Sequence, residues 1–217
     1  MHSVPDSAES PRERRRVETE RALARGARLL TAERGLSGFT VEEVCEGAGV
    51  SRRTFFNYFA SKEDAALGIP ALRGDADAEA AFVAGGDPSS RDLSPTLLDD
   101  LATLAAVRWS RMDVGPRTAA ELFAAVDREP RLLRRIIEHV GLMERSDALL
   151  VERREGLPEG DLRAALAAQT IGMIGRSATE AFLTSDHDRS FEDVYTQRLA
   201  AARDLFATQT IHTESRA

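Results

Sequence analysis

The 217 residues are enough for one large or two small domains, and a hydrophobic content of 42% supplies enough apolar surface for real cores. Uninterrupted apolar runs, such as residues 104–107 and 164–168, fall far below the roughly 18 residues that cross a bilayer, so we expect no membrane partner and a cytoplasmic location. A single cysteine, Cys45, excludes an internal disulfide framework and any site built from several cysteines.

The net charge of −7 is distributed unevenly along the chain. Residues 1–62 carry 11 basic and 9 acidic side chains, whereas residues 63–217 carry 18 basic and 27 acidic ones. A basic end on an acidic protein is typical of a segment that meets a polyanion. Four arginines form a cluster just ahead of the first predicted helix. As part of a mobile arm, this cluster would meet phosphates; alternatively, it is a solvated charged terminus. Its members are Arg12, Arg14, Arg15 and Arg16.

Apolar residues recur at helical spacing, and alternation of β-branched residues never lasts four positions, so we predict an all-α fold. The first helix follows a polar tail to about Pro11 and ends at Gly35. A later helix begins at Ser61, is kinked or interrupted by Pro70, and resumes to about residue 84. Further helices are predicted over residues 95–112, 116–126, 130–155, 162–183 and 191–207.

Residues 39–62, FTVEEVCEGAGVSRRTFFNYFASK, predict two short helices joined by a glycine turn. Thr40 and Glu43 have the spacing of a capping box, so a helix begins directly after Thr40. It ends just before Gly49, because glycine adopts the left-handed conformation that a tight helix exit needs. Ser51 then caps the second helix. The sequence therefore predicts a helix-turn-helix.

The second of these helices has two distinct faces. At 100° per residue, Phe55 and Phe59 fall together on one face, which we expect to be buried. The outward residues are types that hydrogen-bond with base edges and phosphates, which predicts a recognition helix for DNA. They are Arg52, Arg53, Thr54 and Asn57.

Lys62 is the only lysine among 29 basic residues. It lies in the first turn of the helix that Ser61 opens, where the helix dipole disfavours a cation. We therefore expect a phosphate to be its partner.

The span of residues 16–67 resembles the DNA-binding domain of the TetR (tetracycline-repressor-like) family. The shared pattern includes a Gly-Val-Ser turn, an aromatic residue followed by Phe, and Ser-Lys-Glu. The resemblance implies phosphate contacts from Thr40, Tyr58 and Lys62, and a recognition helix that faces the major groove. The predicted DNA-binding set is Thr40, Ser51, Arg52, Arg53, Thr54, Phe56, Asn57, Tyr58 and Lys62.

Two positions depart from the family's pattern. Phe56 stands where the family usually has tyrosine, so the hydroxyl group is absent and an apolar contact, such as one to a thymine methyl group, takes its place. Cys45 replaces the usual alanine on a buried face, where we expect packing rather than redox sensing.

The resemblance also implies a division of the chain into three segments. Residues 1–11 form a flexible tail, residues 12–60 a three-helix helix-turn-helix domain, and residues 61–217 a helical bundle for ligand binding and dimerisation. Such a protein is expected to be a repressor that binds palindromic double-stranded operator DNA as a homodimer and is released by a largely apolar small-molecule effector. Small residues along 162–183 suit a helix that pairs across a dimer axis, although an intramolecular core helix would carry them too.

The effector site is predicted on the middle helices. Trp109, the only tryptophan, lies beside Arg108 and Met112, a combination that suits an apolar molecule with one acidic group. The alternative is a tryptophan that anchors the bundle. Arg108 and His139 interrupt apolar helix faces, so each either reaches solvent or offers a polar anchor. The predicted ligand-binding set is Arg108, Trp109, Met112, Phe123, His139 and Met143.

An enzyme is the strongest competing class, and the sequence does not support it. No glycine-rich phosphate loop follows a strand, no nucleophile lies in a recognisable elbow, and no His-Glu-x-x-His motif is present. We expect neither a cofactor nor a metal. A transcriptional activator or a protein-bridging dimer of the same fold stays open, because repression and activation differ in where the operator lies relative to a promoter.

Overall fold

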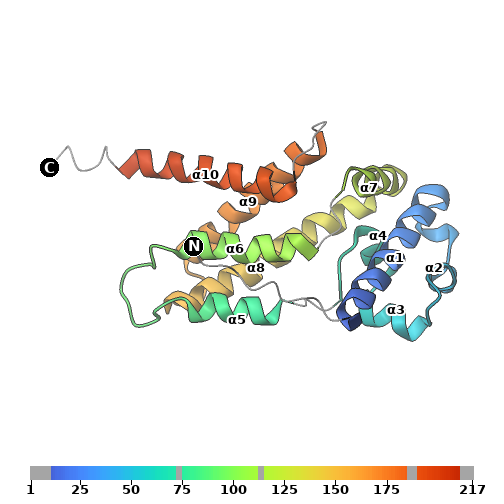
Figure 1. Cartoon of the computed structure of the whole chain (residues 1–217), viewed down its shortest axis with the longest axis horizontal. Coiled ribbons are helices and arrows are strands. Elements are labelled where there is room, and N and C mark those ends of the chain that lie inside the picture. Colours follow the sequence, from blue (N-terminus) through green and yellow to red (C-terminus); the bar gives the residue numbers. More distant parts are fainter. Residues whose placement is uncertain (1–10, 72–74, 112–114, 185–189, 211–217) are drawn as a thin grey trace. The chain divides into compact units, whose positions relative to one another are not determined.

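The computed structural model describes residues 11–71, 75–111, 115–184 and 190–210 (Figure 1). Within these ranges every regular element is a helix, which confirms the predicted all-α fold. The elements are α1 (Pro11–Arg34), η1 (Leu36–Gly38), α2 (Val41–Ala48), α3 (Arg52–Tyr58), α4 (Lys62–Leu67), α5 (Ala76–Ala84), α6 (Leu97–Arg111), α7 (Pro116–Arg128), α8 (Arg131–Glu155), α9 (Leu162–Thr184) and α10 (Phe191–Thr210). In the part of the chain described, no helix is both long enough and apolar enough to cross a membrane.

Two features near the N-terminal end differ from the prediction. The arginine cluster belongs to the first turns of α1 and not to an arm ahead of it. The helix that Ser61 opens is interrupted earlier than Pro70, because Gly68 adopts a left-handed conformation with φ of 72° and closes α4. Pro70 therefore follows a helix end that Gly68 has already made.

The chain forms two compact units. The first unit comprises residues 1–73 and 117–136, and the second comprises residues 74–116 and 137–217. The first unit thus contains α1 to α4 together with most of α7 and the beginning of α8, while α5, α6, the rest of α8, α9 and α10 belong to the second. The functional division at residues 11 and 60 stays a prediction.

Aromatic side chains dominate the core of the first unit. Phe39, Phe55 and Phe59 are buried there with Leu23 of α1, and Leu132 of α8 joins the same cluster. Burial of such large apolar side chains stabilises each by about 1.5–3 kcal/mol relative to exposure. The packing explains why α2 and α3 are held against α1.

Polar contacts hold α7 against α1 in the first unit. Glu121 of α7 lies 3.1 Å from Nε of Arg25 and 3.8 Å from the guanidinium of Arg28. Arg28 is buried, and its Nε also donates to the backbone oxygen of Ala66 in α4 at 3.0 Å. One arginine of α1 therefore joins α4 and α7, and its buried charge is paired with a carboxylate, as a buried charge must be.

Two further contacts involve the segment from the end of α7 to the start of α8. The carboxylate of Glu129 accepts a hydrogen bond from the backbone nitrogen of Leu36 in η1 at 2.7 Å. Arg135 donates to the buried carboxylate of Asp64 in α4 at 2.7 Å. These contacts explain why residues 117–136 group with the N-terminal helices.

The second unit contains a separate core. It is built from apolar residues of α5, α6, α8, α9 and α10, with Leu101, Val151 and Ile174 among its buried members. Tyr195 of α10 is buried in the same cluster, and its hydroxyl donates to the backbone oxygen of Ala102 at 3.3 Å. Burial raises the pKa of Tyr195 to about 12.

A buried arginine organises one end of this second core. Arg154 of α8 is completely buried, and its guanidinium donates to the backbone oxygen of Phe82 at 2.5 Å and to the carboxylate of Asp100 at 2.5 Å. Its Nε donates to Glu155 at 2.9 Å. Glu155 in turn accepts hydrogen bonds from the backbone nitrogen and the hydroxyl of Ser94. Arg154 and Glu155 together hold the connection between α5 and α6 against the end of α8.

Gly86 makes this arrangement possible through its lack of a side chain. A Cβ atom at position 86 would overlap Cγ of Arg154 and would lie 2.5 Å from the backbone oxygen of the same residue. Both approaches are well inside van der Waals contact, and the oxygen belongs to backbone that cannot easily move. Position 86 therefore requires glycine because of the close approach of α8.

We expect Gly86→Ala to lower the free energy of unfolding by about 1–3 kcal/mol, because the methyl group forces apart two packed segments. Gly141→Ala, in the middle of α8, is the matched control: its methyl group meets only the end of Arg145, 3.5 Å away. That control should raise the free energy of unfolding by about 0.5–1 kcal/mol. Denaturant unfolding followed by the emission of Trp109, which lies in this unit, measures both effects. Equal stability of the two variants would contradict the packing described for Gly86.

Candidate nucleic-acid interface

Side-chain caps define the beginning of α2. The hydroxyl of Thr40 accepts from the backbone nitrogen of Glu43 at 3.3 Å, and the carboxylate of Glu43 accepts from the backbone nitrogen of Thr40 at 2.8 Å. This reciprocal pair is the predicted capping box. The hydrogen bond from the Thr40 backbone is the main cause of a lowered pKa of Glu43.

The turn between α2 and α3 also has the predicted geometry. Gly49 has φ of 66° and ends α2, a conformation that favours glycine. Ser51 then begins α3, since its hydroxyl accepts a hydrogen bond from the backbone nitrogen of Thr54 at 3.1 Å. The helix-turn-helix predicted from the sequence is therefore present in the structure.

The inner face of this motif is closed to solvent. Phe55 and Phe59 have no exposed surface, and their ring centroids lie 6.0 Å apart. Cys45 of α2 is buried in the same cluster, and burial is the main cause of a raised pKa of its thiol. A raised thiol pKa lowers the thiolate fraction, which agrees with packing as the role of Cys45.

The outer face of α3 is open. Arg52, Arg53 and Asn57 are exposed, and Phe56 exposes 43% of its surface although it is a large apolar residue. Thr54 differs from the expectation of a fully outward residue, because it is half-buried and its hydroxyl is hydrogen-bonded to that of Ser51 at 2.8 Å.

Arg52 is held on two sides. Its guanidinium lies 2.9 Å from the carboxylate of Glu42 in α2 and 5.6 Å from the ring centroid of Phe56. The stacking on Phe56 is a cation–π contact that tyrosine at this position would also make, so the departure from the family's pattern preserves it. Sequence reasoning missed Glu42, whose only signal was its place in the first turn of the preceding helix.

Lys62 has a partner within the chain. Its Nζ donates to the backbone oxygen of Phe39 at 2.9 Å and lies 4.9 Å from the centroid of the Phe39 ring. These contacts explain a cation in the first turn of α4 without a phosphate, so the helix-dipole argument does not identify a DNA contact. An ammonium group has three donors, and a phosphate contact by Lys62 stays a prediction.

The two remaining predicted phosphate ligands lie in different environments. Thr40 is exposed at the start of α2, and Tyr58 is half-buried in the last turn of α3. The backbone oxygen of Tyr58 accepts a hydrogen bond from the nitrogen of Ala71 at 2.7 Å, which brings the chain after α4 back to the end of α3.

The predicted effector ligand Arg108 is engaged by carboxylates. Its guanidinium is hydrogen-bonded to Asp75, to Glu79 at 2.8 Å and to Asp147 at 2.5 Å. Burial alone would lower the pKa of Arg108, but Asp147 and Asp75 raise it above its ordinary value. The surroundings of Arg108 are thus acidic, and the side chain is not a free cation that awaits an acidic ligand.

Trp109 packs against other parts of the bundle. Its ring stacks on Phe191 of α10, with centroids 5.0 Å apart and planes inclined by 29°. A Cβ atom at Gly175 of α9 would lie 3.3 Å from the indole nitrogen, so the small residue at 175 admits the ring. The contacts fit the alternative in which the tryptophan anchors the bundle.

The other described members of the predicted effector site belong to different units. Phe123 exposes 57% of its surface on α7 in the first unit, whereas His139 and Met143 are half-buried on α8 in the second. Met112 lies outside the described residues. The predicted ligand-binding set therefore stays a prediction, and its described members do not line the cavities that follow.

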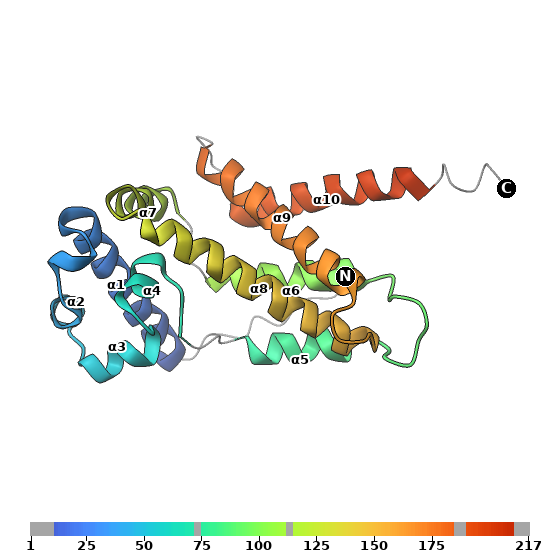
Figure 2. The same ribbon diagram turned by 180° about the vertical axis from the view of Figure 1, so that it is seen from behind.

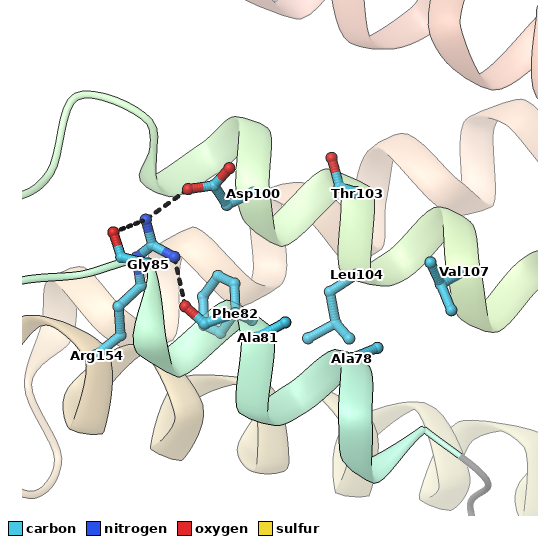
Figure 3. A pocket seen from close by; sticks show the side chains of 9 residues that line it. All are labelled: Ala78, Ala81, Phe82, Gly85, Asp100, Thr103, Leu104, Val107 and Arg154. Carbon is cyan, nitrogen blue, oxygen red and sulfur yellow. Dashed lines mark hydrogen bonds and ion pairs between the residues drawn. The ribbon is translucent and has the colours of Figure 1, made fainter. Parts of the chain in front are cut away.

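The second unit has a cavity of about 300 Å³ between α5, α6 and α8 (Figure 3). Apolar side chains, among them Phe82, Leu104 and Val107, form most of its wall, and Asp100 and Arg154 form one end. A second hollow of about 510 Å³ lies beside α8 and is lined in part by Leu149, Glu152 and Arg153. Neither cavity was predicted, because its lining comes from helices far apart in the sequence.

Comparisons with known proteins agree with the motif at the N-terminal end. Residues 23–66 match the model of the bacterial regulatory proteins of the tetR family. The chain is also 29% identical over 184 residues to the HTH-type transcriptional regulator TcmR of Streptomyces glaucescens, an alignment that covers 82% of this chain and 79% of that protein. With the helix-turn-helix geometry of α2 and α3, these matches show that residues 23–66 form a helix-turn-helix domain like that of the bacterial regulatory proteins of the tetR family, and that most of the chain is similar to a transcriptional regulator.

Proposed function

We propose that this regulator is a repressor that binds a palindromic operator as a homodimer and is released by a small-molecule effector. The observation that carries the proposal is the outer face of α3, where Arg52, Arg53, Phe56 and Asn57 are exposed while Phe55 and Phe59 anchor the helix. An α-helix fits the major groove, and guanidinium and amide groups form bidentate hydrogen bonds with guanine and adenine there.

The residues divide into those that read bases and those that bind phosphates. Arg53 and Asn57 are proposed to read base edges, and Phe56 to contact a thymine methyl group, with Arg52 and Thr54 beside them. The proposed phosphate contacts come from the edges of the motif: Thr40, Ser51, Tyr58 and Lys62. Thr40 and Ser51 are both exposed, which supports this division.

Dimerisation is supported by an unpartnered apolar stripe on α9. Leu162, Leu166 and Met173 expose 70%, 52% and 54% of their surface, and their spacing puts them within about 40° of one another around the helix. An exposed apolar stripe of this kind marks an interaction surface. A second copy of the chain is the proposed occupant, because one recognition helix per chain needs a two-fold partner to read a palindrome.

The effector is proposed to occupy the cavity between α5, α6 and α8. Its mostly apolar wall and single polar end suit a largely apolar small molecule, and its volume is at the low end for ligand sites. An effector releases DNA only if it binds the DNA-free conformation more tightly than the DNA-bound one.

Selection of bound sequences from random DNA at a stated salt concentration tests the proposal as a whole. We expect an inverted repeat whose half-site centres lie about 34–36 Å apart, or a simple multiple of that distance, because the two-fold symmetry of the protein must be mirrored in the DNA. Recovery of asymmetric sites alone would contradict a symmetric dimer on the operator.

Single substitutions separate base reading from phosphate binding. Arg53→Ala and Asn57→Ala should relax base preference at defined operator positions by about 1–3 kcal/mol. Lys62→Ala should weaken binding to all sequences alike and reduce the slope of log K against log[salt] by about 0.9. Because Lys62 also bonds to Phe39, its variant is measured below its unfolding temperature. A change of base preference in Lys62→Ala, with none in Arg53→Ala or Asn57→Ala, would reverse the proposed orientation of α3.

The α9 stripe is tested by two charge substitutions. The L166E/M173E variant should sediment as a monomer at micromolar concentration, because a dimer would bury two carboxylates per chain without partners. Leu133→Glu, on α8, is the matched control: Leu133 has an exposed fraction of 52%, as Leu166 has, and its variant should remain dimeric. If the α9 variant kept the oligomeric state of the natural chain, another surface would have to form the dimer.

A further inference from the structure

The cavity of the second unit has apolar walls over most of its length. The helices α5 and α6 pack side by side, as Figures 1 and 2 show from opposite directions. To the lining α5 contributes Ala78, Ala81 and Phe82, and α6 contributes Leu104 and Val107. These side chains hold no hydrogen-bonding group, so an occupant must be apolar over most of its own surface.

Arg154, at the polar end of the cavity, is not available to a ligand. Its side chain has no exposed surface, and each of its three guanidinium nitrogens already donates a hydrogen bond. Figure 3 shows its contacts with the backbone oxygens of Phe82 and Gly85 and with the carboxylate of Asp100. An acidic group that entered the cavity would therefore find no accessible N–H group of Arg154.

The polar side chains of the lining that remain open accept hydrogen bonds. Asp100 keeps 42% of its side chain exposed, and its side-chain contacts with described residues, from Thr96 and Arg154, are both made by Oδ2. The hydroxyl of Thr103 donates to the backbone oxygen of Asp99 at 2.9 Å, so toward a ligand it can only accept. A ligand at this end must therefore bring its own donors.

The charges at the same end favour a cation. The single guanidinium of Arg154 is in contact with two carboxylates, those of Asp100 and Glu155, which leaves one negative charge in excess. Glu155 is buried, so Asp100 is the carboxylate that a ligand can reach. An ammonium group supplies both donors and charge, and its hydrogen bonds to a carboxylate are stronger than those between neutral groups. A carboxylate on the ligand would be repelled.

We propose that this cavity binds an apolar amine in its protonated form, with the ammonium group donating to Asp100 and the hydrocarbon part lying between α5 and α6. The inference rests on the proposed effector site and adds the chemical class of its ligand. Discrimination against apolar acids is part of it. The acidic group expected from the sequence depended on Arg108, which does not line this cavity.

Three probes that share two fused aromatic rings test the ligand class: 1-naphthylmethylamine, 1-naphthylmethanol and 1-naphthoate. At neutral pH the first is a cation, the second is uncharged and the third is an anion. Calorimetric titration of the natural chain should show that the amine binds about threefold to tenfold more tightly than the alcohol, because its hydrogen bond is charge-assisted. The naphthoate should bind more weakly than the alcohol.

Three variants locate the selectivity. Asp100→Asn removes the charge but keeps an oxygen for Arg154, so it should abolish the preference for the amine over the alcohol. Asp99→Asn is the matched control: Asp99 is the neighbouring residue of α6, is 51% exposed, pairs with Arg203 and does not line the cavity. Its variant should keep the preference. Ala81→Leu fills part of the cavity from an exposed position and should weaken the binding of all three probes.

The opposite outcomes overturn the inference. Binding of naphthoate as tight as that of the amine would reject the ligand class, and so would an amine preference that survives in Asp100→Asn. Amine binding that Ala81→Leu leaves unchanged would assign the probe to another site. Absence of amine binding at millimolar concentration would also reject the inference. If Asp100→Asn does not fold, the order of the three probes and the Ala81→Leu variant decide.

A separate measurement distinguishes the ligand class from the proposed function. The titrations need no DNA, so their result does not depend on operator binding. Operator affinity is then measured with and without saturating 1-naphthylmethylamine. If the amine binds as expected and the operator affinity falls, both the ligand class and the effector site are supported. If the amine binds as expected and the operator affinity is unchanged, the ligand class stands and the cavity is not the effector site.

Discussion

The burial of Phe55 and Phe59 in the core of the first unit is the constraint on which the proposed DNA-binding face depends. The helix α3 has only 7 residues, far fewer than the 12–15 at which an isolated helix becomes even marginally stable in water. Its two turns persist because Ser51 caps one end and two rings without exposed surface hold the inner face. The direction in which Arg53 and Asn57 point therefore depends on two rings that are closed to solvent.

In the second unit, a buried charge takes the place that aromatic rings have in the first. The guanidinium of Arg154 is enclosed by backbone oxygens from the end of α5, by the carboxylate of Asp100 and by Glu155. A buried arginine is costly unless every donor finds an acceptor, so the surrounding chain has little freedom to rearrange. Because Arg154 also forms part of the wall of the cavity between α5, α6 and α8, a molecule that enters this cavity meets a polar end held by hydrogen bonds and mostly apolar sides.

Local signals in the sequence were sufficient for the helix-turn-helix. The capping box of Thr40 and Glu43, the left-handed Gly49 and the cap at Ser51 act over three or four residues, so their consequences were predictable without knowledge of the tertiary fold. The burial of Phe55 and Phe59 followed from helical periodicity in the same way. Gly68 was a signal of the same kind, and the earlier end of α4 shows that it outweighs Pro70.

The partners of polar side chains were not predictable, because they come from distant parts of the chain. Lys62 donates to a backbone oxygen 23 residues away, and Arg135 pairs with Asp64 across 71 residues. Arg108 was predicted to bind the acidic group of a ligand, but its guanidinium is hydrogen-bonded to three carboxylates from two other helical regions. Periodicity predicts which face of a helix turns inward, but it does not identify the groups from other parts of the chain that this face contacts.

The single lysine has a practical consequence for the chemistry of the molecule. All but one of the 29 basic side chains are arginines, whose guanidinium groups do not react with the common acylating reagents, so Lys62 is the only ε-amine in the sequence. It lies at the start of α4, half-buried, with its nitrogen bonded to Phe39. Among side chains, amine-directed labelling, surface immobilisation and enzymatic acylation all converge on this one atom, and each would modify the protein at the edge of its proposed DNA-binding face.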